Sequence, residues 1–327
     1  MSQYLLEARE LTKNFPASGK KAVHAVSGVS LQIREGETLG LVGESGCGKS
    51  TLGRLLIRLL RPTSGEVLFR GQSITNMTEK EFHPLRREMQ LVFQDPYASL
   101  DPRMSVRDLI AEPIENWRLR EGREAVTDKV LELLRAVGLP EEFLHRYPHQ
   151  FSGGQRQRIG IARAVAADPS FIVCDEPVSA LDVSVQNQIL NLLKELKTSR
   201  SLTYLFISHD LSVVRYLSDR VCVMFLGKVC EIGPTGEVYR HPRHPYTHFL
   251  LDAVPLPDPS QRGKEVRLLE GEPPSPADPH SGCRFRTRCP YAQARCAQEE
   301  PRLRDLDGVQ VACHFAESHR DAEGVAQ

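Results

Sequence analysis

A glycine-rich stretch in the first fifty-odd residues has the types and spacing of a phosphate-binding loop. It reads Gly43-Glu44-Ser45-Gly46-Cys47-Gly48-Lys49-Ser50-Thr51, which fits G-x-x-x-x-G-K-[ST]. In such a loop the backbone N–H groups surround phosphate oxygens, and the N-terminus of the next helix adds partial positive charge. Lys49 would reach the β- and γ-phosphates, and the Ser50 hydroxyl would bind Mg²⁺. The loop therefore predicts a site for a nucleoside triphosphate with Mg²⁺.

Two further motifs contain residues that could bind a metal ion, a water molecule or an anion. The apolar run Phe171–Cys174 ends in Asp175 and Glu176, which a buried strand would place at the carboxyl edge of a sheet, where ligands bind in open α/β folds. Two neighbouring carboxylates favour a cation nearby, so we expect Asp175 to assist Mg²⁺ and Glu176 to orient the attacking water. Ser152-Gly153-Gly154-Gln155 precedes a helix-forming stretch and could bind a second anion, although the same residues could be only a helix cap.

In their order along the chain, these motifs resemble the ATP-binding cassette of ABC transporters over roughly residues 5–235. By this resemblance, Walker A is Gly43–Thr51, the Q-loop glutamine is Gln94, the signature motif is Ser152–Gln155, Walker B with its catalytic glutamate is Phe171–Glu176, the D-loop is Ser179-Ala180-Leu181-Asp182, the switch histidine is His209, and an adenine-stacking aromatic is Phe15. Phe151 departs from the family, in which leucine usually precedes the signature serine.

The resemblance implies that two cassettes pack head to tail, so that ATP held by one phosphate loop meets the signature motif of the other. It assigns ATP binding to Phe15, residues 43–51, Gln94 and Asp175. It assigns Mg²⁺ binding to Ser50, Gln94 and Asp175, and catalysis to Lys49, Gln94, Glu176 and His209.

Local sequence narrows the resemblance to one branch of the family. The stretches VFQDPYASLDPR and DEPVSALDVSVQNQIL, and the segment HPRHPYTHFLLDAVP at 241–255, resemble the dipeptide, oligopeptide and nickel importer ATPases, most closely the second ATPase subunit of the dipeptide importers. The implied partners are a related ATPase in a heterodimer, two transmembrane permeases and, indirectly, a periplasmic or lipid-anchored peptide-binding protein. Gln94 and residues 97–100 are candidates for the permease contact, or else an ordinary surface loop. The resemblance leaves nickel and glutathione open as alternative cargo.

Eight cysteines fall into two groups. Cys47, Cys174, Cys222 and Cys230 stand singly in apolar or motif segments and are expected to be small buried hydrophobes. Cys283, Cys289, Cys296 and Cys313 cluster near the end, where a cytosolic chain favours a metal site over disulfides. Their spacing does not fit a C-x₂-C zinc ribbon.

This cysteine segment resembles the C-terminal segment of the peptide importer ATPases, which implies a [4Fe–4S] cluster on the four cysteines. Zinc or free thiols remain alternatives, and His314 could replace one cysteine. Such a cluster would be a structural clip, with a redox sensor as the alternative role. For Arg284, Arg286 and Arg288 we expect a solvated face, as against residues that offset cluster charge or bind lipid headgroups.

The elements that must position these residues alternate between strand and helix patterns. Strands are expected at residues 37–43, 89–94, 171–176, 203–209 and 220–227, with helices at 52–60, 155–166 and 183–197. This pattern predicts an α/β fold of the P-loop NTPase ABC-cassette type, with a mostly parallel sheet, an antiparallel β subdomain and a helical insertion. The expected domains are a nucleotide-binding core at 1–94 and 151–235, a helical subdomain at 95–150, and an irregular, metal-binding C-terminal extension at 236–327 that is too proline-rich to be mainly helical.

The composition and the motifs together argue against several other classes of function. Lys+Arg and Asp+Glu are equal at 42 each, which argues against a basic nucleic-acid binder. No secretory signal or membrane-spanning run is evident, so we expect a peripheral protein on the cytoplasmic face of the plasma membrane. A non-transport ABC ATPase is disfavoured because neither a tandem cassette nor a coiled-coil insertion is evident. A general P-loop GTPase or kinase would not explain the Ser-Gly-Gly-Gln motif and His209 together.

Overall fold

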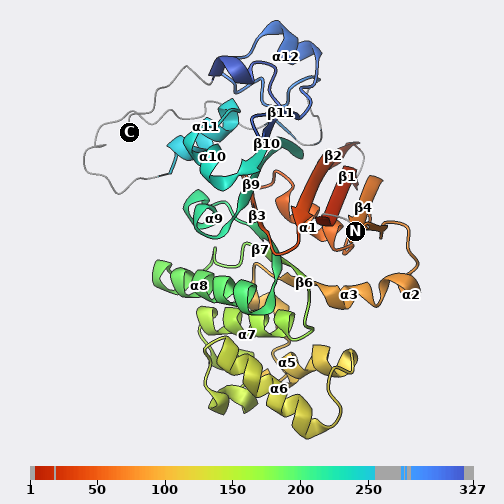
Figure 1. Cartoon of the computed structure of the whole chain (residues 1–327), viewed down its shortest axis with the longest axis vertical. Coiled ribbons are helices and arrows are strands. Elements are labelled where there is room, and N and C mark those ends of the chain that lie inside the picture. Colours follow the sequence, from red (N-terminus) through yellow and green to blue (C-terminus); the bar gives the residue numbers. More distant parts are fainter. Residues whose placement is uncertain (1–3, 18–19, 255–273, 276, 278–280, 320–327) are drawn as a thin grey trace. The chain divides into compact units, whose positions relative to one another are not determined.

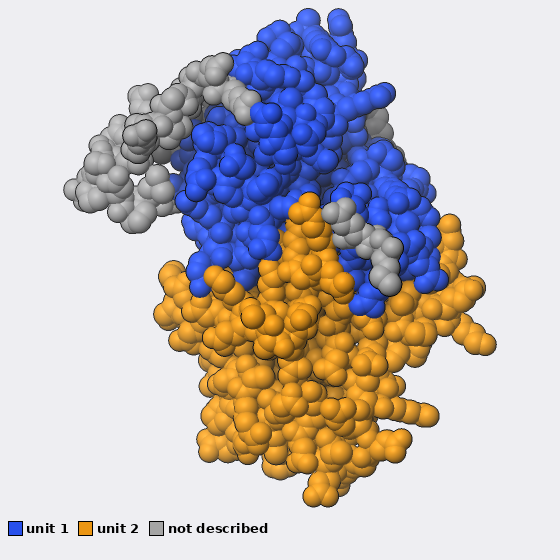
Figure 2. All heavy atoms as spheres, viewed as in Figure 1, with its two compact units in different colours: residues 1–33, 39–75, 208–327 blue, residues 34–38, 76–207 orange. Residues whose placement is uncertain are grey.

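The computed structural model describes residues 4–17, 20–254, 274–275, 277 and 281–319 (Figure 1). These residues form two compact units, which Figure 2 colours blue and orange. Unit 1 comprises residues 1–33, 39–75 and 208–327, and unit 2 comprises residues 34–38 and 76–207. Much of the proline-rich stretch, residues 255–273, lies outside the described residues.

Unit 1 contains an antiparallel sheet in the order β2-β1-β4-β5 (Figure 1). Its strands are β1 (Tyr4–Ala17), β2 (Lys20–Arg34), β4 (Ser64–Phe69) and β5 (Gln72–Ser73). Leu6 pairs with Phe69 and Ala8 with Val67, and all four side chains are buried. The expected antiparallel β subdomain is therefore present, because alternate apolar side chains along these strands share one covered face.

A second set of strands in unit 1 runs in the order β11-β12-β10-β9-β3. These are β3 (Thr38–Val42), β9 (Arg220–Phe225), β10 (Lys228–Pro234), β11 (Arg304–Leu306) and β12 (Val309–Val311). β3 and β9 are parallel, whereas β10, β12 and β11 are antiparallel to their neighbours. The last two strands, β11 and β12, thus extend the sheet beside β10. The expected irregular C-terminal extension did not include them.

Helices flank these strands in unit 1. They are α1 (Lys49–Leu56), α9 (Leu211–Leu217), α10 (Thr235–Arg240), α11 (Pro245–Asp252), α12 (Ala294–Gln298) and a 3₁₀ turn, Ala316–His319. The start of the C-terminal extension is therefore helical in spite of its prolines. Pro245 is tolerated because it occupies the first turn of α11, where its missing N–H would have no helical partner.

Helix α1 begins earlier and ends earlier than the expected span of residues 52–60. Its end has the hydrogen bonds of a Schellman motif, from Leu59 N–H to the Arg54 carbonyl and from Arg58 N–H to the Leu55 carbonyl. Arg58 takes the left-handed conformation, φ 53°, that this motif requires. No glycine marks the position, so local sequence does not indicate where the helix ends.

Unit 2 contains three parallel strands in the order β8-β7-β6, namely β6 (Met89–Val92), β7 (Phe171–Asp175) and β8 (Thr203–Ile207). Its helices are α2 (Glu79–Phe82), α3 (Leu85–Glu88), α4 (Pro96–Ser99), α5 (Val106–Asn116), α6 (Arg123–Ala136), α7 (Gly153–Val165) and α8 (Val183–Arg200), with 3₁₀ turns Glu141–His145 and Pro148–Gln150. Helices α5, α6 and α7 pack on one another, and α7 packs on α8. The mixed α/β class is thereby confirmed.

The four cysteines that stand singly in apolar or motif segments are buried, as predicted for small apolar side chains. They are Cys47, Cys174, Cys222 and Cys230. In the part of the chain that the structure describes, no helix has both the length and the apolar character needed to span a bilayer.

Candidate functional site

The glycine-rich loop of unit 1 connects the end of β3 to the start of α1, which is the predicted strand–loop–helix context. Two of its glycines are required by backbone contacts. A Cβ at Gly43 would lie 2.1 Å from the Met224 carbonyl oxygen, and one at Gly48 would lie 2.1 Å from the Ala25 carbonyl oxygen. Gly48 also has φ 103°, a conformation that other residues rarely adopt. The neighbouring strands therefore fix the course of the loop.

The Lys49 side chain is buried and folds back over this loop. Its Nζ donates to the Gly43 carbonyl oxygen at 2.7 Å and to the Glu44 carbonyl oxygen at 2.9 Å. The ammonium is thus held beside the loop backbone, where a phosphate group would replace the carbonyls as its partner. This position suits the predicted phosphate-binding role of Lys49.

In unit 2 the structure brings together two residues that lie 82 positions apart, Gln94 and Glu176. Gln94 Nε2 donates to Glu176 Oε2 at 2.9 Å. Asp175, the last residue of β7, is 3% exposed, and Glu176 follows it with φ 47°. A left-handed conformation costs energy for a residue with a side chain and often marks a functional site. The Glu176 carboxylate thus meets the Gln94 amide directly after the end of β7.

The Ser152 and Asp182 side chains in unit 2 cap helices. Ser152 Oγ accepts from Gln155 N–H at 3.3 Å and Gln155 Oε1 accepts from Ser152 N–H at 3.0 Å, which together form a capping box at the start of α7. Asp182 caps α8, and the Ser184 hydroxyl lowers the pKa of its carboxyl by a hydrogen bond. The capping alternative for Ser152 is therefore real, and the N-terminus of α7 still presents backbone N–H groups.

The remaining predicted residues of the nucleotide site lie in unit 1. His209 is exposed between β8 and α9, and Asp210 beside it caps α9 through its carboxylate. Phe15 is a partly exposed residue of β1, with Lys13 Nζ 5.2 Å from the centre of its ring. The predicted nucleotide-site residues are thus divided between the two units, and their roles toward ATP stay predictions.

The phosphate loop has two partners that the sequence did not indicate, both from the C-terminal part of unit 1. The Tyr246 hydroxyl accepts a hydrogen bond from Glu44 N–H at 2.8 Å. Arg288 Nη1 lies 2.9 Å from both carboxylate oxygens of Glu44. The HPYT sequence and the arginines that alternate with cysteines pointed to these two segments. Neither pattern indicated that Tyr246 or Arg288 would contact Glu44.

The expectation of a solvated arginine face is therefore wrong for Arg284 and Arg288. The Arg288 side chain is 7% exposed, and Arg284 donates to the Leu226 carbonyl and to Ser27 Oγ. Burial also lowers the pKa of Arg284. Side-chain packing against the sheet, which no local pattern reveals, covers these guanidinium groups.

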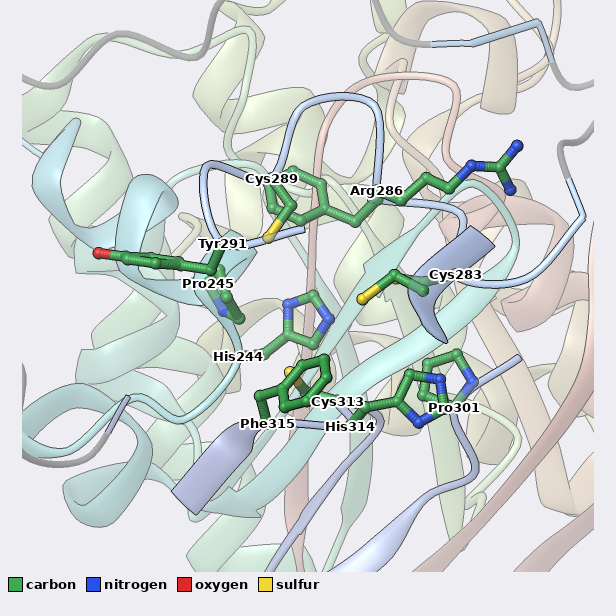
Figure 3. A pocket seen from close by; sticks show the side chains of 12 residues that line it. His244, Pro245, Cys283, Arg286, Cys289, Tyr291, Pro301, Cys313, His314 and Phe315 are labelled. Carbon is green, nitrogen blue, oxygen red and sulfur yellow. The ribbon is translucent and has the colours of Figure 1, made fainter. Parts of the chain in front are cut away.

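Four cysteines of unit 1, Cys283, Cys289, Cys296 and Cys313, line one pocket beside His244 (Figure 3). Figure 3 shows the sulfur atoms of Cys283 and Cys289 directed toward its interior.

Burial raises the pKa of Cys289 to about 12 and that of Cys313 to about 11, and the negative charge of the other thiolates adds to both shifts. Four thiolates would thus need a cation to share this pocket. Among the described residues, however, no three His, Cys, Asp or Glu side chains are arranged to hold a metal ion. His314 Nε2 is 3.0 Å from the Glu299 carbonyl oxygen, so that nitrogen already has a partner.

The candidate permease-binding loop of unit 2 is only partly exposed. The Tyr97 side chain is 65% exposed and stacks under the Arg156 guanidinium, whose carbon lies 3.5 Å from the ring centre. Phe93 is also exposed, whereas Leu100 is 3% exposed. Leu100 is therefore a core residue, and it is removed from the predicted contact.

Comparison with known proteins is consistent with this geometry. Residues 26–179 match the family model for the ABC transporter, and residues 230–296 match the model for the oligopeptide/dipeptide transporter C-terminal region. The putative oligopeptide transport ATP-binding protein YkfD of Bacillus subtilis is 56% identical over 98% of this chain and 97% of its own length. The oligopeptide transport ATP-binding protein OppF of Salmonella typhimurium is 51% identical over 90% of this chain and 88% of its own.

Among solved structures, the dimeric post-hydrolysis ATP-binding cassette MJ0796 bound to ADP and phosphate is similar, with a TM-score of 0.65 and 31% identity. The match covers 70% of this chain and 98% of that one.

Proposed function

This chain belongs to the family of oligopeptide and dipeptide ABC transporter ATP-binding proteins, and we propose that it is the ATP-hydrolysing motor subunit of a bacterial importer of dipeptides or oligopeptides. The observation that carries the proposal is the loop between β3 and α1. Its backbone is fixed by close contacts at Gly43 and Gly48, and Lys49 is buried against it. Similarity to named transport ATPases over nearly the whole chain supports the choice of peptide cargo.

In the proposed reaction the loop N–H groups and Lys49 bind and neutralise the phosphates of ATP, because phosphoryl transfer needs mainly positioning and charge stabilisation. Glu176 orients the attacking water and accepts its proton, while the Gln94 amide holds the Glu176 carboxylate. His209 contacts the γ-phosphate. Ser50, Gln94 and Asp175 supply oxygen atoms suited to Mg²⁺, which would neutralise charge on the β- and γ-phosphates.

For assembly, we propose a heterodimer with a related ATPase, in which the signature residues Ser152–Gln155 and the D-loop at Asp182 meet the partner's nucleotide. The dimeric state of the similar cassette supports a paired arrangement. Exposed Phe93 and Tyr97 suit contact with one of two permeases, so the complex would lie on the cytoplasmic face of the plasma membrane. A periplasmic or lipid-anchored binding protein would deliver the peptide.

The test is transport by the assembled complex. The chain, its companion ATPase, the permeases and the binding protein are reconstituted in liposomes, and uptake of di- and oligopeptides is compared with uptake of nickel and glutathione. We expect ATP-dependent peptide uptake, which Lys49→Ala abolishes. Uptake of nickel or glutathione alone would refute the cargo, and unchanged ATP hydrolysis by Lys49→Ala would refute the site.

For the cysteine pocket, we propose that Cys283, Cys289, Cys296 and Cys313 hold a [4Fe–4S] cluster as a structural clip. The four thiols suit the donor set by type and by their shared pocket, and the raised pKa values of Cys289 and Cys313 call for a compensating cation. The cluster would supply folding free energy to a segment with little core of its own. Protein purified without oxygen should contain iron and acid-labile sulfide, and zinc in their place, or neither, would refute the cluster.

A further inference from the structure

We propose that Tyr246 and Arg288 are positioning residues for the phosphate-binding loop, and that they act on ATP through Glu44. The inference rests on the proposed ATP-binding function and gives the HPYT segment and the cysteine segment a task in it. Neither residue belongs to the predicted nucleotide site. Both lie more than 190 positions after the loop, in the same unit.

Glu44 is held at its backbone and at its side chain. The Tyr246 hydroxyl accepts from the Glu44 N–H at 2.8 Å, which fixes the orientation of the peptide group that follows Gly43. Arg288 Nη1 lies 2.9 Å from Glu44 Oε1 and from Oε2. Two charge-assisted contacts from one buried guanidinium nitrogen restrict the carboxylate to a single place. The first turn of the loop is therefore set by the C-terminal segments.

The charge of Glu44 gives this contact a consequence for nucleotide binding. A carboxylate in a loop that receives a polyphosphate repels it unless a cation is close. Arg288 supplies that cation. Its side chain is 7% exposed and that of Glu44 is 28% exposed, so solvent screens the pair only in part. Without Arg288, the Glu44 charge would oppose ATP binding.

Tyr246 and Arg288 can act as fixed supports because their own surroundings are packed. Tyr246 is fully buried, with ring centres 4.8 Å from Phe225 and 5.4 Å from Phe285.

The HPYT segment is also anchored to β10. Both oxygens of the buried Glu231 accept backbone N–H groups, from Arg243 at 2.9 Å and from His244 at 3.0 Å. His244 Nδ1 in turn accepts from Tyr246 N–H at 3.1 Å. Movement of the cysteine segment, which carries Phe285 and Arg288, would thus reach the loop directly.

The experiment measures the dissociation constant for MgATP on the full chain, and KM and kcat in the assembled transporter. Arg288→Ala should weaken MgATP binding about tenfold and raise KM in proportion, with kcat changed less. Tyr246→Phe keeps the ring and removes only the acceptor, so we expect about a threefold weakening. Arg288→Lys keeps the charge and loses the paired contact, so its effect should be intermediate.

The decisive comparison repeats Arg288→Ala in a chain that already carries Glu44→Gln. There it should change MgATP affinity by less than about twofold relative to Glu44→Gln alone, because Arg288 no longer has a carboxylate to hold or to neutralise. A purely structural role for Arg288 would lower the melting temperature and the affinity equally in both backgrounds. Unchanged MgATP affinity in Arg288→Ala, or an equal loss in both backgrounds, would overturn the proposal.

Arg295→Ala is the matched control, since Arg295 forms an exposed ion pair with Glu299 in the same segment. It should leave affinity unchanged. If Arg288→Ala does not fold, the proposal is tested instead by the dissociation constants for MgATP of the milder variants Tyr246→Phe and Arg288→Lys. A wild-type chain that binds no MgATP would instead refute the proposed function, which separates the two outcomes.

Discussion

Replacing Glu176 by Gln tests the chemical step with little change elsewhere. The glutamine side chain has the same shape, and its carbonyl oxygen can still accept the 2.9 Å hydrogen bond from Gln94 Nε2. The backbone of residue 176, φ 47°, places no new demand on glutamine because the two residues have the same branching at Cβ. We therefore expect stability to change by less than about 0.5 kcal/mol, as for substitutions that remove no packing.

The lost function is that of a general base, which contributes about 10²- to 10⁴-fold to a rate. The kcat for ATP hydrolysis should fall by this factor, equivalent to about 3–5 kcal/mol of transition-state free energy. MgATP binding should persist, because Lys49 and the loop N–H groups are untouched, and the paired cassettes should be trapped in the closed state.

Single-turnover kinetics measure the loss of hydrolysis, and nucleotide retention measures MgATP binding. Size-exclusion chromatography measures the fraction of dimer. Steady-state turnover within threefold (roughly 0.65 kcal/mol) of the wild-type chain would refute the assignment of Glu176.

Three further outcomes follow from the packing. Burial raises the pKa of Glu231 from 4.5 to about 7. The folded state therefore keeps the Glu231 proton up to a higher pH than the unfolded state does. The free energy of unfolding should thus fall by about 3 kcal/mol as the pH rises from about 4.5 to 7. Urea unfolding of the wild-type chain and Glu231→Gln across that range should show a smaller loss in the variant, and parallel curves would contradict this. Phe285→Ala should cost about 3–5 kcal/mol of unfolding free energy, because its fully buried ring packs on Phe225 and Tyr246, and calorimetry measures the loss. Ser152→Ala should cost about 1 kcal/mol through loss of the α7 cap, whereas an unchanged melting temperature would show that the cap is dispensable.

The sequence predicted the local parts of this protein well. The loop before α1 and the buried strand that leads to Asp175 each follow from short patterns of glycine, apolar and charged residues. Such patterns report the conformation of neighbouring residues, which is why these elements appear where expected. Gln94 and Glu176 were both expected at the site, but no pattern in the sequence indicated the hydrogen bond between them.

The missed features depend on contacts between distant segments. The end of α1 at Arg58 uses a left-handed residue that is not glycine, and no composition rule indicates it. Leu100 was expected in the permease-binding loop because the resemblance pointed to residues 97–100, yet packing buries its side chain. The Arg288–Glu44 pair spans 244 positions, so its existence depends on how the C-terminal segment folds over the sheet.

The place of β12 beside β10 bears on what shortened forms of this protein would do in solution. Glu231 and Ile232 of β10 pair with Val311 and Gln310, and Ala312 N–H donates to the Cys230 carbonyl. A chain that stops before the cysteine segment would leave those β10 carbonyl and N–H groups as an open sheet edge. Open edges recruit strands from other copies, so truncated chains should aggregate even where their nucleotide loop is intact.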